Sequence, residues 1–182
     1  NIINLLGIEE PKDYFFSYFK QMDLLKDEID YTLLRQSDLI IYAAGAGIQS
    51  ALNTDSDLMY SLNLFVPIDL CNTLKKINYT GVYISFGSYM EIGLNEDETQ
   101  FFDEKQIELS DLPATNDYAL SKRLLTRFMG NLKTPFSFWH FILPNTFIKD
   151  ETGTRLIPYV LEYLNKTKKG ETCDVPRFSS GE

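Results

Sequence analysis

The residues in this sequence best suited to move a proton are Tyr118 and Lys122, which stand four positions apart. Residues at this spacing share one face of a helix, so the phenol and the ammonium would point the same way. A positive charge beside a phenol favours the phenolate form, and Tyr118 could then serve as a general acid and base. The chain has a single histidine, His140, so few other side chains could do this work. Many solvated helix faces carry such a pair, and the surrounding elements therefore decide what it means.

Those elements alternate in type along the chain. Short apolar runs predict four strands, the first of them weaker than the rest, at residues 15–22, 37–44, 81–86 and 134–143. One-sided apolar spacing predicts three helices, at residues 55–76, 116–131 and 155–169. Pro67 should break the first of these helices near Val66. Strands that alternate with helices of this length are typical of a doubly wound α/β fold, a parallel sheet with helices on both faces.

Composition narrows the class of function. The chain has 182 residues, 44% of them hydrophobic, which suits one domain with a sizeable core. Its net charge of -9 would repel nucleic acid and anionic membranes, and no apolar run is long enough to span a bilayer. Two cysteines are too few for a disulfide framework, which favours a reducing compartment. We therefore expect a cytoplasmic protein that binds neither nucleic acid nor a membrane.

Several features follow one another in an order that resembles a known family. They are Asp23-Leu24, residues 38–45 (DLIIYAAG), Asn63, the turn at Ser85, the pair Tyr118 and Lys122, and Pro144-Asn145. This order, over roughly residues 16–182, is similar to the extended short-chain dehydrogenase/reductases of the NAD-dependent nucleotide-sugar epimerase/dehydratase group. The resemblance implies a Rossmann-type sheet, NAD or NADP as cofactor, a nucleotide-sugar substrate and a homodimer. Biosynthesis of surface polysaccharide would be its natural setting.

The resemblance also implies a role for each matching residue. Tyr118 would exchange a proton with a sugar oxygen, Lys122 would hold the nicotinamide ribose, and a serine of the turn, Ser85 or Ser88, would hydrogen-bond the reacting oxygen. The other residues would line the two binding sites: Asp23 and Leu24 at the adenine, Ala43, Ala44 and Gly45 along the cofactor channel, Asn63 at the strand ends, and Asn145 at the nucleotide sugar.

Two departures from the family pattern limit the reaction. Phe86 stands where the family usually has a catalytic serine or threonine, so Ser85 or Ser88 must serve. Gly87 and Ser88 stand where the family's dehydratases have an acidic pair, which argues against sugar dehydration. An epimerase or a keto-sugar reductase remains. The alternatives are a non-catalytic Rossmann-type domain that binds a nucleotide or a partner and, more weakly, a lone interaction module.

The family's glycine-rich phosphate loop and the strand before it are missing from the sequence. Residues 1–7 then correspond to the helix after that loop, and the second strand is poorly marked. We expect an incomplete dinucleotide-binding domain at residues 1–170, the start of a substrate-binding segment at 171–182, and a chain that is part of a longer protein. The acidic stretch 95–111 should be a solvated loop. His140 and Cys71 are expected to be core residues.

Overall fold

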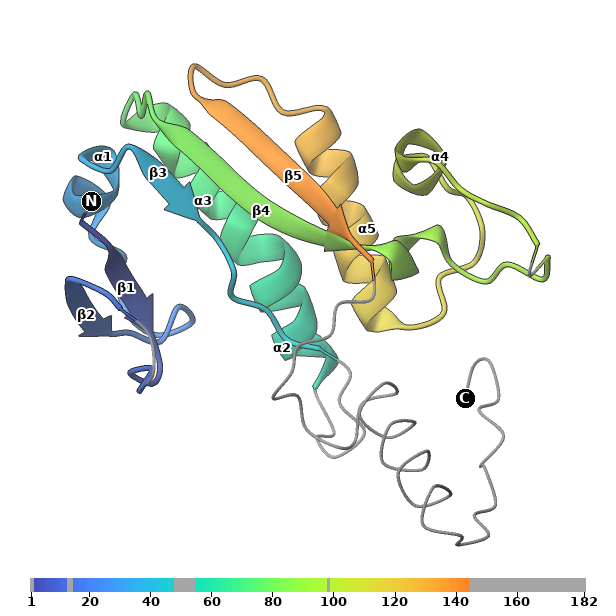
Figure 1. Ribbon diagram of the computed structural model, residues 1–182, viewed down its shortest axis with the longest axis horizontal. Helices are drawn as coiled ribbons and strands as arrows, with labels where there is room; N and C mark the ends of the chain where they lie inside the picture. The colour runs from blue at the N-terminus through green and yellow to red at the C-terminus, as the bar shows by residue number, and fades with distance from the viewer. Residues whose placement is uncertain (1, 13–14, 48–54, 98, 145–182) are drawn as a thin grey trace, which may run out of the picture. The chain divides into compact units, whose positions relative to one another are not determined.

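The computed structural model describes residues 2–12, 15–47, 55–97 and 99–144 (Figure 1). The chain divides into two compact units, Asn1–Leu143 and Pro144–Glu182, and the description that follows concerns the first. The predicted helix at 155–169, the segment 171–182 and Asn145 lie outside the described residues.

Three parallel strands form the larger sheet, in the order β3-β4-β5. They are β3 (Leu39–Ile41), β4 (Val82–Ser88) and β5 (Ser137–Leu143). The register pairs Ser85 with His140 and Ser88 with Leu143, so β4 and β5 end at the same edge of the sheet. The three stronger strand predictions are confirmed.

A second parallel sheet holds only β1 (Asn4–Gly7) and β2 (Tyr18–Gln21). The weak strand prediction at residues 15–22 is confirmed. The prediction of a helix at residues 1–7 is wrong, because Asn4–Gly7 is a strand paired along its length with β2. A short apolar run does not distinguish strand from helix, and here the pairing with β2 decides between them.

The predicted helix at 55–76 is three segments. Helix α2 (Ser56–Tyr60) leads into a π-helical turn, η1 (Ser61–Phe65), and then into α3 (Val66–Lys76). The break falls at the predicted place. Pro67 has no N–H to donate to the preceding turn, and the chain ahead of it is wound as a π turn rather than an α-helix.

The predicted helix at 116–131 is α5 (Asp117–Gly130), and Asn116 caps it by accepting a hydrogen bond from the Ala119 N–H at 2.9 Å. The other helical segments are short: α1 (Tyr31–Arg35), the 3-10 turn η2 (Tyr89–Ile92) and α4 (Glu104–Glu108). Helix α4 corrects the prediction that 95–111 is loop throughout, because Asp103 and Gln106 form a capping box that starts a helical turn. No helix in the described part of the chain is long and apolar enough to cross a membrane.

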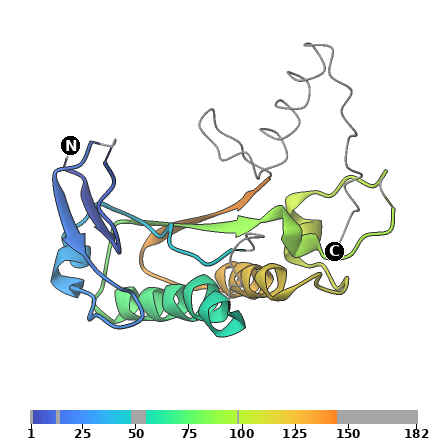
Figure 2. The same ribbon diagram turned by 90° about the horizontal axis from the view of Figure 1, so that it is seen from below.

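Helices α3 and α5 pack on the same face of the β3-β4-β5 sheet (Figure 2). The core between them is apolar and holds Tyr83, Leu74, Leu125, Met129 and Cys71, each at most 1% exposed. Cys71 is therefore the buried residue that was expected. The parallel sheets with their helices confirm the Rossmann-type fold class.

Candidate active site

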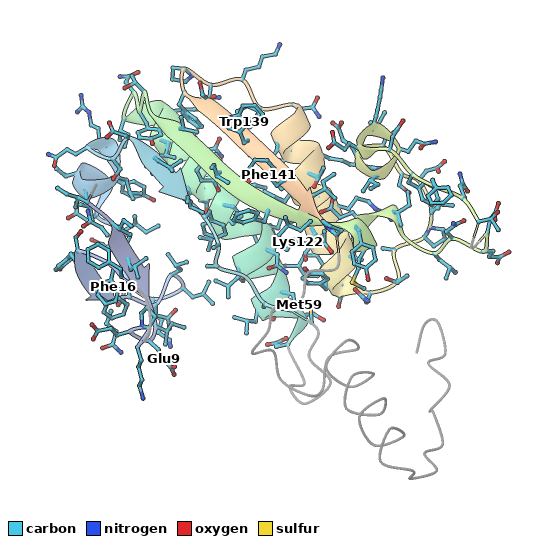
Figure 3. All side chains as sticks on the ribbon, viewed as in Figure 1. Glu9, Phe16, Met59, Lys122, Trp139 and Phe141 are labelled. Atoms are coloured by element: carbon cyan, nitrogen blue, oxygen red, sulfur yellow. The ribbon has the colours of Figure 1, made fainter. Side chains whose placement is uncertain are left out.

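Tyr118 and Lys122 lie one turn apart on α5, and the Lys122 ammonium is 6.0 Å from the centre of the Tyr118 ring. Lys122 Nζ also donates a hydrogen bond of 3.0 Å to the carbonyl oxygen of Phe86, near the end of β4. Figure 3 shows Lys122 where α5 meets this end of the strand. Burial lowers the pKa of Lys122, and the nearby carboxyl group of Glu91 opposes that shift.

Asn63 holds the segment that follows β3 against the helices. Its Oδ1 accepts from the Ala46 N–H at 3.0 Å, and its Nδ2 donates to the Ala46 carbonyl at 2.8 Å and to Ser121 Oγ at 3.2 Å. Gly45 precedes this contact, and a Cβ there would lie 2.8 Å from Asn63 Oδ1 and 3.8 Å from Lys122 Nζ. A side chain at this position would collide with Asn63, so glycine lets the backbone pass close to the amide. Asn63, which the family resemblance placed at the strand ends, thus contacts Ala46 in the segment after β3.

The two candidate serines lie in different settings. Ser85 is fully buried in the middle of β4, with its Oγ 2.8 Å from His140 Nδ1. Ser88 is the last residue of β4, and its hydroxyl caps η2 by accepting from the Met90 N–H at 3.3 Å. Ser88 thus lies at the sheet edge where β4 and β5 end, whereas Ser85 precedes it by three residues within the strand.

The residues expected at the cofactor line one cavity. Asp23, Leu24, Ala43, Ala44 and Gly45 all border a space of about 740 Å³ that also touches the carboxyl ends of β1, β2 and β3. Cofactor pockets commonly have volumes of roughly 300–1,000 Å³ and mostly apolar walls. The walls of this cavity are mostly apolar, Gly45 adds backbone without a side chain, and Asp23 and Lys26 are the charged residues among them, a composition compatible with a dinucleotide.

Asp23 is held in place by its neighbours. Its carboxylate accepts from the Leu25 N–H at 3.0 Å and forms an ion pair of 2.7 Å with Lys26. The hydrogen bond from Lys26 lowers the pKa of Asp23, so the carboxylate is charged at neutral pH. This fixed acceptor lies directly after β2, at the wall of the cavity.

Three further residues, His140, Thr126 and Glu91, lie near Lys122 between α5 and the sheet. His140 was expected in the core; it is half-buried, and both of its ring nitrogens have partners: Nε2 lies 2.8 Å from Thr126 Oγ1 and Nδ1 lies 2.8 Å from Ser85 Oγ. The sequence analysis did not single out Thr126 or Glu91. The spacing could have found Thr126, which follows Lys122 by four residues on the same helix face. Glu91 had no such signal, because the turn after β4 sets its position.

The parallel sheets, with α3 and α5 packed on the larger one, define a Rossmann-type α/β fold. The chain matches the NAD dependent epimerase/dehydratase family over residues 7–182, and it belongs to that family. The family resemblance drawn from the sequence is therefore confirmed. The prediction of NAD or NADP as cofactor is confirmed at the level of the family, which is NAD dependent.

Three solved structures of similar fold contain NAD or NADPH. A dTDP-glucose 4,6-dehydratase from Bacillus anthracis in complex with NAD has a TM-score of 0.58 and 16% identity, over 85% of this chain and 45% of that one. RMD from Pseudomonas aeruginosa complexed with NADPH has a TM-score of 0.59 and 16% identity, over 88% and 57%. The Bordetella bronchiseptica enzyme WbmG in complex with NAD and UDP has a TM-score of 0.58 and 14% identity, over 94% and 53%.

At these identities the likeness shows the fold alone. The chain spans about half the length of these structures, between 45% and 57%. A search of the curated proteins found no match.

Proposed function

We propose that this protein is an NAD- or NADP-dependent enzyme that epimerises or reduces a nucleotide-linked sugar. The observation that carries the proposal is the position of Tyr118 and Lys122 on one face of α5, with Lys122 tied to the end of β4. The cavity at the ends of β1, β2 and β3 supports it, because it joins the expected cofactor residues to the same edge of the fold. Two of the similar structures are a dTDP-glucose dehydratase with NAD and an enzyme with NAD and UDP.

The residues of this chain would divide the work as follows. A nicotinamide dinucleotide, when bound, supplies hydride transfer at a sugar carbon. Tyr118 gives a proton to the sugar oxygen or takes one from it, so that no free alkoxide forms. The Lys122 ammonium, 6.0 Å from the centre of the Tyr118 ring, holds the ribose hydroxyls of the dinucleotide. Asn63 keeps the backbone after β3 in place for the cofactor.

Of the two serines, Ser88 is the better partner for the reacting oxygen. It ends β4, and its hydroxyl accepts from Met90 and keeps its own O–H to donate. Ser85 is fully buried against His140. Dehydration is not proposed, because Gly87 and Ser88 offer no acidic side chain and the carboxyl of Glu91 is fully buried.

The main test is Tyr118→Phe, which removes the hydroxyl and keeps the ring. Turnover by the full-length protein should fall by about 100-fold or more, measured as chromatographic conversion of UDP-glucose or dTDP-glucose to its epimer, or as consumption of NAD(P)H with the corresponding 4-keto sugar. Dinucleotide affinity and thermal unfolding should stay unchanged. Tyr89→Phe, at a tyrosine that is 40% exposed, is the matched control and should keep full turnover. Full turnover in Tyr118→Phe would refute the proposed role.

A non-catalytic, nucleotide-binding domain is the second candidate, favoured by Phe86. Its ring stacks on Phe141, with the centroids 6.4 Å apart, at the position where the family usually has a serine or threonine. Mass spectrometry of the nucleotide released on denaturation distinguishes the candidates. Retained NAD supports an epimerase, and an empty protein that binds NADPH supports a reductase. Dinucleotide binding without turnover, or turnover that appears only after Phe86→Ser, supports the non-catalytic, nucleotide-binding domain, and no affinity for either dinucleotide supports an interaction module.

The homodimer is also a proposal. By the family resemblance, two copies of the chain would pair through the helical regions 55–76 and 116–131. In this structure the first region comprises α2, η1 and α3, and the second is α5. Light scattering coupled to size-exclusion chromatography of the full-length protein would report twice the chain mass if the proposal holds.

A further inference from the structure

Three buried side chains and the half-buried His140 form a continuous chain of hydrogen bonds next to Lys122. Ser85 Oγ lies 2.8 Å from His140 Nδ1, and His140 Nε2 lies 2.8 Å from Thr126 Oγ1. Thr126 Oγ1 and Glu91 Oε1 border the same space beside Gly87, and a hydrogen bond from Thr126 lowers the pKa of the Glu91 carboxyl, whose Oε2 is buried without a hydrogen-bond partner. These residues come from β4, β5, α5 and η2, so each of the elements around the end of β4 contributes one.

The number of protons that these groups can donate decides which group is the donor in each hydrogen bond. A carboxylate only accepts, and a threonine has a single O–H to donate, which Thr126 gives to Glu91. His140 must then carry its proton on Nε2 and donate it to Thr126, while its Nδ1 accepts from Ser85. Every hydrogen bond in the chain therefore points toward Glu91, and aligned bonds of this kind strengthen one another in a buried site.

Gly87 makes room for this arrangement. A Cβ at this position would collide with Glu91 Oε1 and lie 2.8 Å from His140 Nε2 and 3.1 Å from Thr126 Oγ1. Three polar atoms thus converge on the space that a side chain would fill. The carboxyl of Glu91 has a further donor in the Ser88 N–H, at 2.6 Å.

Lys122 and the carboxyl of Glu91 reach the same stretch of β4: Lys122 Nζ donates to the Phe86 carbonyl at 3.0 Å, and Glu91 Oε1 accepts from the Ser88 N–H at 2.6 Å. The titratable groups around Lys122 are Tyr118 on its own helix, His140 on β5 and Glu91 on η2. Burial, and secondly the charge of Lys122, lower the pKa of His140 to about 4, so the ring is neutral at neutral pH. Arg123 lies on the other side of Glu91, with its Nε bonded to the Glu91 carbonyl at 2.6 Å.

We propose that Glu91 is a positioning residue for Lys122: its buried carboxylate, held by Ser88 and by the directed chain from Ser85 through His140 and Thr126, balances the charge of the lysine. Glu91 is fully buried and acts through Lys122 rather than on a substrate. The effect on catalysis rests on the proposed function, whereas the effect on the lysine is a property of the protein alone.

The test is Glu91→Gln in the full-length protein, which removes the charge and keeps the shape. The pKa of Lys122 is read from the NMR shift of its ε-carbon without cofactor or substrate, and the signal is assigned by its loss in Lys122→Met. We expect this pKa to fall by about 1, a tenfold change in the protonation equilibrium. Glu104→Gln, an exposed residue of α4, makes the same change of net charge and should leave it unmoved. An unmoved Lys122 in folded Glu91→Gln would overturn the proposal.

A second pair of variants decides the matter if Glu91→Gln does not fold. Thr126→Val removes the hydroxyl that holds Glu91 and should lower the pKa of Lys122, whereas Thr126→Ser keeps the hydroxyl and should restore it. Equal values in the two variants would also overturn the proposal. Dinucleotide affinity, measured on the same samples, separates the two ideas: a responsive Lys122 without dinucleotide binding refutes the proposed function alone, and the reverse refutes this inference alone.

Discussion

The two faces of the β3-β4-β5 sheet are built from the same strands but differ in what lies against them. The face under α3 and α5 buries Tyr83 and Ser85 completely. On the other face, Trp139 is 60% exposed and Phe141 is 45% exposed (Figure 3). His140 lies between these two aromatic residues in the sequence, yet its ring points to the covered side, where it bonds Ser85 and Thr126. Alternation along a strand therefore separates two environments residue by residue.

The comparison shows why the chemistry gathers on one side. On the covered face, burial shifts the pKa of Lys122 and His140 downward and that of Glu91 upward, and each of these three side chains has a hydrogen-bond partner on another element. On the open face, Trp139 stacks on Phe141 with the centroids 6.2 Å apart. Substitutions should therefore have large effects on one face and small effects on the other.

The largest difference is expected within α5. Leu125 is 1% exposed and its neighbour Leu124 is 39% exposed. Leu125→Ala should cost about 2–5 kcal/mol of unfolding free energy, because it leaves a cavity in the core. The same change at Leu124 should cost roughly 0.5 kcal/mol or less. Urea denaturation of the full-length variants measures both, and equal losses would mean that α5 presents a different face to the sheet.

The pH dependence of stability tests the covered face through His140. Its pKa is about 4 in the folded protein against 6.5 ordinarily. Between these values the unfolded chain binds a proton that the folded chain does not, so stability is complete above pH 6.5 and is lost as the pH falls toward 4. The loss from this group should reach about 3 kcal/mol.

Glu91 contributes to the pH dependence of stability with the opposite sign. Because its pKa is raised by folding, the folded protein takes up this proton at a higher pH than the unfolded chain does. The difference between the native protein and His140→Gln isolates the histidine, which is the only one in the sequence. Denaturation curves at a series of pH values should converge or cross for the two proteins on acidification. Parallel curves would show that His140 is not buried in its neutral form.

The smallest effect is expected on the open face. Trp139→Ala removes a large ring from the surface and leaves no enclosed cavity. The loss of its stacking with Phe141 should therefore lower the free energy of unfolding by roughly 0.5–1.5 kcal/mol. The same denaturation experiment measures it. A loss of several kcal/mol would contradict the comparison, because it would mean that this face is covered in solution.

Much of the framework could be read from the sequence because its signals are local. The apolar runs predicted four strands correctly, Asn116 marked the start of α5, and Pro67 marked the break before α3. The first strand was missed because Asn4–Gly7 has no periodic pattern of its own and is defined by its pairing with β2. Helix α4 was missed because a single capped turn in an acidic stretch is too short to show a period.

The sequence by itself determined that Tyr118, Lys122 and Thr126 share one face of α5, because the period of a helix is a local property of the backbone. Only the tertiary structure decided what that face meets. Ser85 and His140 are 55 residues apart and become neighbours through the register of β4 and β5, and Thr126 joins them because α5 packs on that side of the sheet. Glu91 enters the same cluster through the turn that follows β4. Local spacing can place a proton donor on a helix, but the field around it comes from long-range packing.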